Sequence, residues 1–123
     1  DVSDNVDGLL RFTPGAPAIV HLDYLQRPGQ HTLELTGSEG RITWDNATAI
    51  ARRYDALRET WEEYSPPPGF ERNHLFLAEM PHFLRVLNGD EAPRCTLQDG
   101  IEALRITEAV HQSAREGCLV KFT

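Results

Sequence analysis

The sequence predicts an α+β domain, with the strands in the first half of the chain and the helices in the second. Two observations support this class. Between residues 6 and 44, apolar and polar side chains alternate in short runs, which is typical of half-buried strands. After the proline-rich stretch 65–69, apolar residues recur every three or four positions, as on one side of a helix. Such a chain folds as an open, mostly antiparallel sheet with two helices packed on one face.

The clearest pattern is a hairpin over residues 33–44. Two alternating runs flank a two-residue tip, Ser38-Glu39, which lies between two glycines. A shift of one residue would divide the large apolar side chains between both faces, so the register is strongly specified. The expected pairs are Gly37 with Gly40, Leu35 with Ile42, and Leu33 with Trp44.

Two earlier strands, residues 6–12 and 18–25, are expected to join this hairpin in one meander. Turn residues lie between them at 13–15 and again at 27–30. The expected pairs are Leu10 with Val20, Leu22 with Leu35, and Tyr24 with Leu33. One face is then apolar, and the other is free for water or for oligomerisation. That open face carries Asp7, Arg11, Ile19, His21, Asp23, Glu34, Arg41 and Thr43.

Residues 47–64 have two interpretations. Alternation favours a fifth strand over 48–54 and a short sixth strand over 60–62, which we prefer. The alanine, arginine and glutamate content favours a helix instead. The stretch 65–69, Ser-Pro-Pro-Pro-Gly, excludes regular structure and is expected to act as a stiff spacer.

Two helices are expected to follow the spacer. Asn73 is the predicted cap of the first, which ends at Asn88-Gly89 and should be kinked by Pro81. Asp99 is the predicted cap of the second, which stops at Gly117. Residues 118–122 are expected to form a terminal strand.

The composition excludes several classes of protein. With 40% hydrophobic and 25% charged residues and a net charge of −7, nucleic acid and anionic membrane surfaces are disfavoured partners. No apolar run is long enough to span a membrane, and no signal peptide is visible. Cys95 and Cys118 are too few for a disulfide framework and are expected to be reduced. We therefore expect a cytoplasmic domain, and the start at Asp1 suggests one excised from a longer protein.

Few residues carry a recognisable chemistry. The chain has no Gly-x-Gly-x-x-Gly fingerprint and a single lysine, Lys121, so no dinucleotide cradle is predicted. His21 and Asp23 lie on the same strand face, where they could bind a metal or relay a proton. On a solvated strand such a pair is more often structural. No catalytic, cofactor-binding or metal-binding residue is predicted.

The order of elements resembles the C-terminal domain of Gfo/Idh/MocA-family oxidoreductases over nearly the whole chain. The resemblance is carried by the hairpin 34–42, by Glu79–Phe83 in the first helix, and by a second helix that opens at Asp99-Gly100 and ends with Gln112–Gly117. In that family an N-terminal Rossmann domain binds NAD(P), and a Glu-Lys-Pro motif supplies the catalytic lysine. Neither is present in this chain.

The resemblance implies that residues 1–123 form a single substrate and oligomerisation domain of an NAD(P)-dependent sugar or polyol dehydrogenase. The fragment alone would be inactive and bind no cofactor, whereas the full-length enzyme would bind NAD or NADP. The domain would line the substrate cleft and pack its open sheet face against another subunit, giving a homo-oligomer.

The resemblance also places the loop before the hairpin at the substrate. In inositol dehydrogenase relatives this loop often carries tyrosines, whereas here it carries Arg27, Pro28, Gly29 and Gln30. Arg27 and Gln30 are therefore the predicted substrate-binding residues, with Arg72 and Asn73 at the helix start as further candidates. Arginine suits an anionic or highly hydroxylated ligand. The alternative role for Arg27 is that of a solvated turn residue.

Two other functions remain open at this point. One is a non-enzymatic sheet module for dimerisation or carbohydrate binding, and the other is a scaffold domain with no ligand. Residues encoded upstream of Asp1 would discriminate, because a Rossmann fingerprint followed by Glu-Lys-Pro is expected only for the dehydrogenase.

Overall fold

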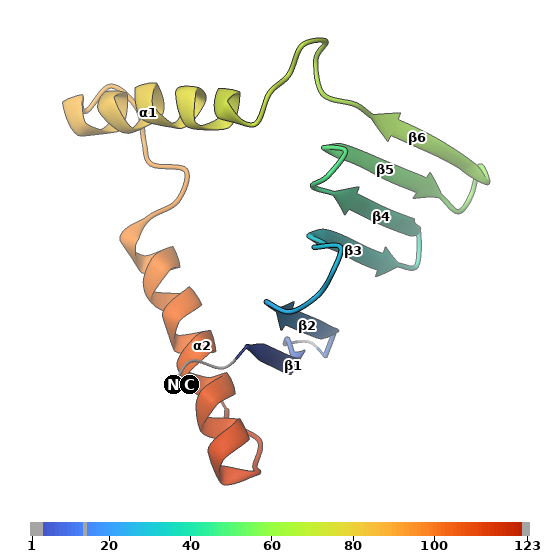
Figure 1. Cartoon of the computed structure of the whole chain (residues 1–123), viewed down its shortest axis with the longest axis vertical. Helices are drawn as coiled ribbons and strands as arrows, with labels where there is room; N and C mark the ends of the chain where they lie inside the picture. The colour runs from blue at the N-terminus through green and yellow to red at the C-terminus, as the bar shows by residue number, and fades with distance from the viewer. Residues whose placement is uncertain (1–3, 14, 122–123) are drawn as a thin grey trace. The chain divides into compact units, whose positions relative to one another are not determined.

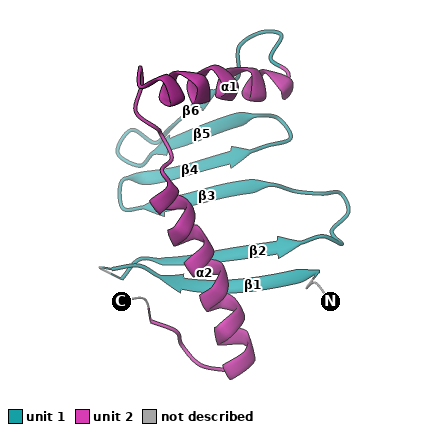
Figure 2. Ribbon diagram, turned by 90° about the vertical axis from the view of Figure 1, so that its left-hand side faces the viewer, with its two compact units in different colours: residues 1–70 teal, residues 71–123 magenta. Residues whose placement is uncertain are grey.

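The computed structural model describes residues 4–13 and 15–121, which form six strands and two helices (Figure 1). The chain divides into two compact units (Figure 2): residues 1–70 hold the strands and residues 71–123 the helices. This order confirms the α+β class. The packing of both helices on one sheet face, and the free face for oligomerisation, stay predictions. The strands are β1 (Asn5–Arg11), β2 (Pro17–Asp23), β3 (Thr32–Gly37), β4 (Gly40–Asp45), β5 (Ile50–Asp55) and β6 (Thr60–Tyr64).

The strands form two antiparallel sheets rather than one meander. β1 pairs with β2, and β3 to β6 pair in sequence order. The expected pairing of β2 with β3 is therefore wrong, including the pairs Leu22–Leu35 and Tyr24–Leu33. The eight-residue link 24–31 is not the tight turn that would force neighbouring strands together. It is bonded within itself instead, since the Leu25 N–H donates to Asp23 Oδ1 at 2.6 Å.

The hairpin of β1 and β2 has the predicted faces but a different register. Leu10 lies opposite Ala18 rather than Val20, while Val6 lies opposite Leu22. The turn sets this register, because the Phe12 N–H donates to the Ala16 carbonyl at 2.8 Å. A shift of two residues leaves every side chain on its original face. The predicted division into an apolar and a polar face is therefore unchanged here.

The hairpin of β3 and β4 has the predicted register, with Leu35 opposite Ile42 and Leu33 opposite Trp44. The strand interpretation of residues 47–64 is also confirmed by β5 and β6, although Thr48 belongs to a turn. The helical alternative is wrong because aspartate turns interrupt this stretch ten residues apart. Asp45 accepts the Ala47 N–H at 2.9 Å, and Asp55 accepts the Leu57 N–H at 3.0 Å.

The first helix, α1 (Asn73–Asn88), has the predicted bounds but not the predicted cap. Asn73 is its first helical residue, and the preceding Arg72 makes no side-chain capping bond. The Glu71 N–H donates instead to the His74 ring. Pro81 lies inside the helix, which runs over 16 residues, and Gly89 ends it in the left-handed region at φ 82°.

The second helix, α2 (Leu97–Glu116), begins before the predicted cap. Thr96 is the N-cap and Asp99 is the third helical residue, and the two side chains form a reciprocal capping box. Gly117 ends the helix as predicted. Residues 118–121 are not a strand, because the Cys118 carbonyl accepts the Ser113 hydroxyl at 2.7 Å. Residue 122 of the predicted strand lies outside the described residues.

Cys95 and Cys118 are free thiols, as predicted. Within the described part of the chain no side chain is fully buried. On the apolar face of the four-stranded sheet, Leu33, Leu35 and Ile42 are 50%, 53% and 42% exposed. Neither described helix is long and apolar enough to cross a membrane.

Candidate functional site

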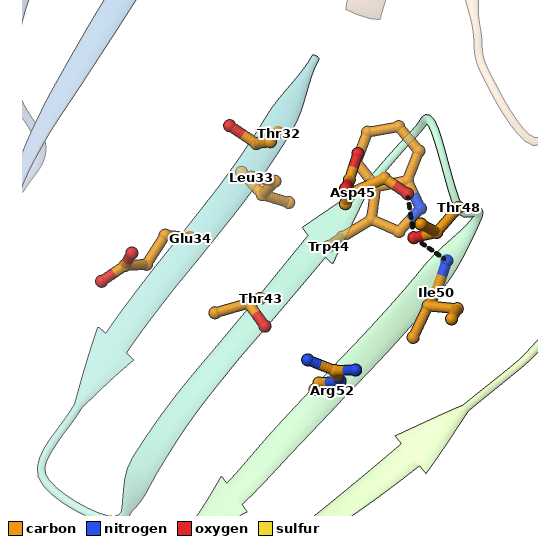
Figure 3. Close-up of a pocket in the computed structure, with 9 residues that line it drawn as sticks. All are labelled: Thr32, Leu33, Glu34, Thr43, Trp44, Asp45, Thr48, Ile50 and Arg52. Carbon is orange, nitrogen blue, oxygen red and sulfur yellow. Dashed lines mark hydrogen bonds between the residues drawn. The ribbon is translucent and has the colours of Figure 1, made fainter. Parts of the chain in front are cut away.

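A hollow of about 380 Å³ lies over one end of β3, β4 and β5 (Figure 3). Antiparallel pairing places the start of β3 beside the end of β4, and the end of β4 beside the start of β5. The loop 24–31 enters β3 at this same end. The hollow is lined by Thr32, Leu33, Glu34, Thr43, Trp44, Asp45, Thr48, Ile50 and Arg52.

The lining combines apolar and polar side chains, and two of its charged groups are already paired. Glu34 Oε2 lies 2.5 Å from Arg41 Nη2, and Arg52 Nε lies 3.0 Å from Glu63 Oε2. All four side chains are about half exposed, so these pairs contribute little stability. Paired carboxylates and threonine hydroxyls keep further acceptor positions. The hollow therefore presents acceptor oxygens beside apolar side chains.

The rings of His31 and Trp44 contact each other edge to face, with centroids 5.1 Å apart and planes at 86°. The His31 carbonyl also accepts the Asn46 N–H at 3.0 Å. These contacts fix the last residue of the loop 24–31 against β4 and its following turn. Sequence analysis missed His31. Continuing the hairpin register by one pair places it opposite Asn46 and next to Trp44, which is the signal that could have found it.

Arg27 folds back onto its own loop. Its Nη1 donates to the Tyr24 carbonyl at 3.0 Å and to the Gln26 carbonyl at 2.8 Å. Gln30 lies exposed in the same loop, three residues further on. Both residues lie in the loop that enters β3, and neither belongs to the lining of the hollow given above. Their role in binding substrate stays a prediction.

The other two candidates, Arg72 and Asn73, are neighbours at the start of α1, in the second unit. Both are exposed, and the Arg72 carbonyl accepts the Leu75 N–H at 3.1 Å. This bond is part of the first helical turn. A role for either residue in substrate binding also stays a prediction.

The suggested pair of His21 and Asp23 is divided between two other partners. His21 Nδ1 lies 2.7 Å from Asp7 Oδ1 on β1, while Asp23 Oδ1 accepts the Leu25 N–H. The hydrogen bond to Asp7 raises the pKa of His21, and the negative charges of Asp7 and Asp23 add to this. Among residues 4–13 and 15–121 no group of three or more His, Cys, Asp or Glu is placed to hold a metal. These contacts favour the structural interpretation.

The comparison with family models found a match that covers nearly the whole chain. The model described as "Oxidoreductase family, C-terminal alpha/beta domain", of the Gfo/Idh/MocA type, matches residues 2–122. The chain belongs to the Gfo/Idh/MocA oxidoreductase family. It is a C-terminal domain of that family, as the order of its elements predicts. No curated protein and no solved structure matched the chain.

Several glycines of this family member have structural roles in the sheet and at the helix ends. Gly40 pairs with Gly37 at the hairpin tip and has φ 154°. A side chain at Gly40 would collide with the Tyr54 carbonyl, so this glycine is required by the close approach of β5. Gly89 and Gly117 end helices rather than begin them. An NAD(P) pyrophosphate therefore finds no glycine-rich helix start among the described residues.

Proposed function

We propose that this chain is the substrate-facing and subunit-contact domain of an NAD(P)-dependent sugar or polyol dehydrogenase. The match of the oxidoreductase C-terminal domain to residues 2–122 carries this proposal. In such an enzyme the nicotinamide moves hydride to or from a secondary hydroxyl, and the protein binds and orients the reactants. The contribution of this chain is to bind substrate and to contact a second subunit.

The substrate side is the loop 24–31 together with the hollow at the end of β3. Both carbonyl bonds of Arg27 use Nη1, so Nε and Nη2 point their remaining donors elsewhere. The hollow adds hydroxyl and carboxylate oxygens from β3, from β4 and from the turn after β4. Arginine donors and hydroxyl or carboxylate acceptors are both groups that bind the hydroxyls of a sugar or polyol, each of which donates and accepts.

The test is the catalytic efficiency of the Arg27→Ala variant of the full-length protein. Loss of a charged hydrogen bond to substrate should lower kcat/KM roughly ten- to a hundred-fold, or about 1.5–3 kcal/mol. Arg58→Ala is the matched control, because Arg58 is an exposed arginine in the turn between β5 and β6. If Arg27→Ala stays within about two-fold of wild type, Arg27 is only a turn residue.

The subunit contact is proposed for the open faces of the two sheets. On the β1–β2 hairpin, Ile19 is 81% exposed beside Leu9 at 77%. Arg41 and Thr43 lie on the polar face of the four-stranded sheet. In a dimer with two-fold symmetry, the same face of each chain can contact the other chain. Ile19→Asp should therefore shift sedimentation toward monomer, whereas Leu57→Asp, at a turn 93% exposed, should not. A wild-type chain that is monomeric at high concentration contradicts this contact.

A further inference from the structure

The loop 24–31 is fixed at both of its ends. At its start, the Tyr24 N–H donates to the Asp4 carbonyl at 2.9 Å, next to β1. At its end, the His31 carbonyl accepts the Asn46 N–H at 3.0 Å, in the turn after β4. A segment that is ordered before it binds a ligand loses less conformational freedom on binding. The loop therefore presents its side chains on a prepared backbone.

The guanidinium of Arg27 is held in one direction by this backbone. Its Nη1 donates to the carbonyls of Tyr24 and Gln26, at 3.0 and 2.8 Å, which uses both hydrogens of that nitrogen. Nε and Nη2 have no partner among the described residues. Their N–H groups lie in parallel along one edge of the planar group, where they match two oxygens of a carboxylate or phosphate. We call this edge of Arg27 the guanidinium fork.

No acidic side chain compensates the charge of the fork. Among the described arginines, Arg27 is the one that is fixed by side-chain hydrogen bonds and yet forms no ion pair. The loop 24–31 contains no acidic residue, although the chain has 19 and a net charge of −7. Asp23, just before the loop, accepts the Leu25 N–H instead. Six other arginines are paired with glutamates: Arg41, Arg52, Arg53, Arg85, Arg94 and Arg105.

The fork lies in an open part of the loop. Arg27, Pro28, Gly29 and Gln30 are all exposed. A Cβ atom added at Gly29 would meet no atom within 4 Å. The amide of Gln30 both donates and accepts hydrogen bonds, so it can bind a hydroxyl group. The loop thus has space for a small ligand and offers it a directed cation and an amide.

We propose that the loop 24–31 binds a carboxylate or phosphate group of the substrate through Nε and Nη2 of Arg27, so that the enzyme acts on anionic sugars. This inference rests on the proposed function and narrows its substrate class from sugars and polyols to sugar acids and sugar phosphates. A neutral hydroxyl has one oxygen and no charge, and it occupies one N–H group of the fork. Hydrogen bonds between ionised groups are roughly twice as strong as those between neutral groups.

The first test is an NMR titration of the full-length protein, followed at the Nε–H signal of Arg27. Loss of the signal in Arg27→Lys identifies it. The probes are glucose, glucuronate and glucose 6-phosphate, which carry a hydroxyl, a carboxylate or a phosphate at the same carbon. The signal should move with one or both anions and not with glucose, and the response shows which anionic group is bound. No movement with either anion, or an equal movement with glucose, overturns the proposal.

The second test is calorimetry with the anion that moves the signal. Arg27→Lys keeps the positive charge but removes the planar fork. It should weaken binding of this anion about tenfold, as expected for the loss of one charged hydrogen bond. Arg58→Lys, at an exposed arginine in the turn between β5 and β6, is the matched control and should leave the affinity unchanged. An affinity of Arg27→Lys within about two-fold of wild type overturns the proposal.

The outcomes also separate this inference from the proposed function. Oxidation of neutral sugars with no preference for the anionic ones overturns the narrowed substrate class and leaves the dehydrogenase proposal in place. Binding of an anion through Arg27 by a full-length protein that oxidises no sugar or polyol supports the fork and contradicts the dehydrogenase proposal.

Discussion

Single residues decide where the four-stranded sheet turns. The turns after β4 and β5 each start with an aspartate that accepts a backbone N–H two residues later. Each ends with a residue in the left-handed region, Ala49 and Glu59, both at φ 55°. A side chain in this conformation costs about 1 kcal/mol, whereas glycine adopts it readily. The register of the sheet is thus kept at the expense of two strained positions.

Replacing Ala49 with glycine should stabilise the protein. The relief of left-handed strain exceeds the added entropy of the unfolded chain, so the free energy of unfolding should rise by about 0.5–1 kcal/mol. Chemical denaturation measures this change. Glu59→Gly should give a similar gain, and Ala47→Gly, in the same turn as Ala49, should give none. A loss of stability in Ala49→Gly would show that the turn does not adopt this conformation.

The bond between His21 and Asp7 gives a prediction about pH. Because the pKa of His21 is raised, the bond stabilises the hairpin below the ordinary value of 6.5 and is lost as the pH rises through the folded value. In an NMR titration, Asp7→Asn should return the pKa of His21 toward its ordinary value. Asp23→Asn should lower it less, because Asp23 acts through charge alone. Equal effects of the two substitutions would contradict the hydrogen bond.

Among the elements, the two helices differ in how they begin. α2 has a reciprocal capping box, in which Thr96 Oγ1 accepts the Asp99 N–H at 3.2 Å and Asp99 Oδ2 accepts the Thr96 N–H at 2.7 Å. α1 has no side-chain cap at Arg72. The start of α2 is therefore fixed by its capping box, whereas before α1 the Glu71 N–H donates to the His74 ring.

Removal of the α2 cap should be measurable. Thr96→Ala should lower the free energy of unfolding by about 1 kcal/mol, within a range of roughly 0.5–2. Thr96→Ser keeps the accepting hydroxyl and should change it much less. Amide exchange over the first turn of α2 locates the effect. Equal destabilisation by both substitutions would mean that the lost methyl group, rather than the cap, is responsible.

Local patterns predicted most of these elements and few of their contacts. Alternation and the glycine-bounded tip gave the hairpin of β3 and β4, because one face must hold every large apolar side chain. The cap of α2 was placed at Asp99 because any of several polar residues before an apolar run can be a cap. Contacts between side chains were harder to predict than elements. Asp7 contacts His21, 14 positions away, and His31 contacts Trp44, 13 positions away. Such contacts depend on register, which the sequence of one strand does not contain.

For the whole molecule, family membership and the residues of the candidate site both support the proposed substrate-binding role. The chain is an oxidoreductase-family C-terminal domain that carries a hollow of mixed lining and an exposed loop arginine. Gly37 and Gly40 form a hairpin tip, and Gly89 and Gly117 end helices. The only lysine is Lys121, close to the C-terminus. The proposed role of this chain in the enzyme is therefore binding, and hydride transfer would depend on NAD or NADP.

The isolated chain should therefore bind neither NADH nor NADPH. Pyrophosphate is normally bound by N–H groups of a glycine-rich turn at a helix start. Here α1 begins at Asn73, and the Glu71 N–H before it donates to the His74 ring. The N-cap of α2 is Thr96, whose N–H donates to the Asp99 carboxylate. The Asp99 carboxylate at the start of α2 would also repel a phosphate. Calorimetric titration of the chain, with a Rossmann-fold dehydrogenase as positive control, measures this. A dissociation constant below about 10 μM, or roughly −7 kcal/mol, would show that this domain holds the cofactor itself.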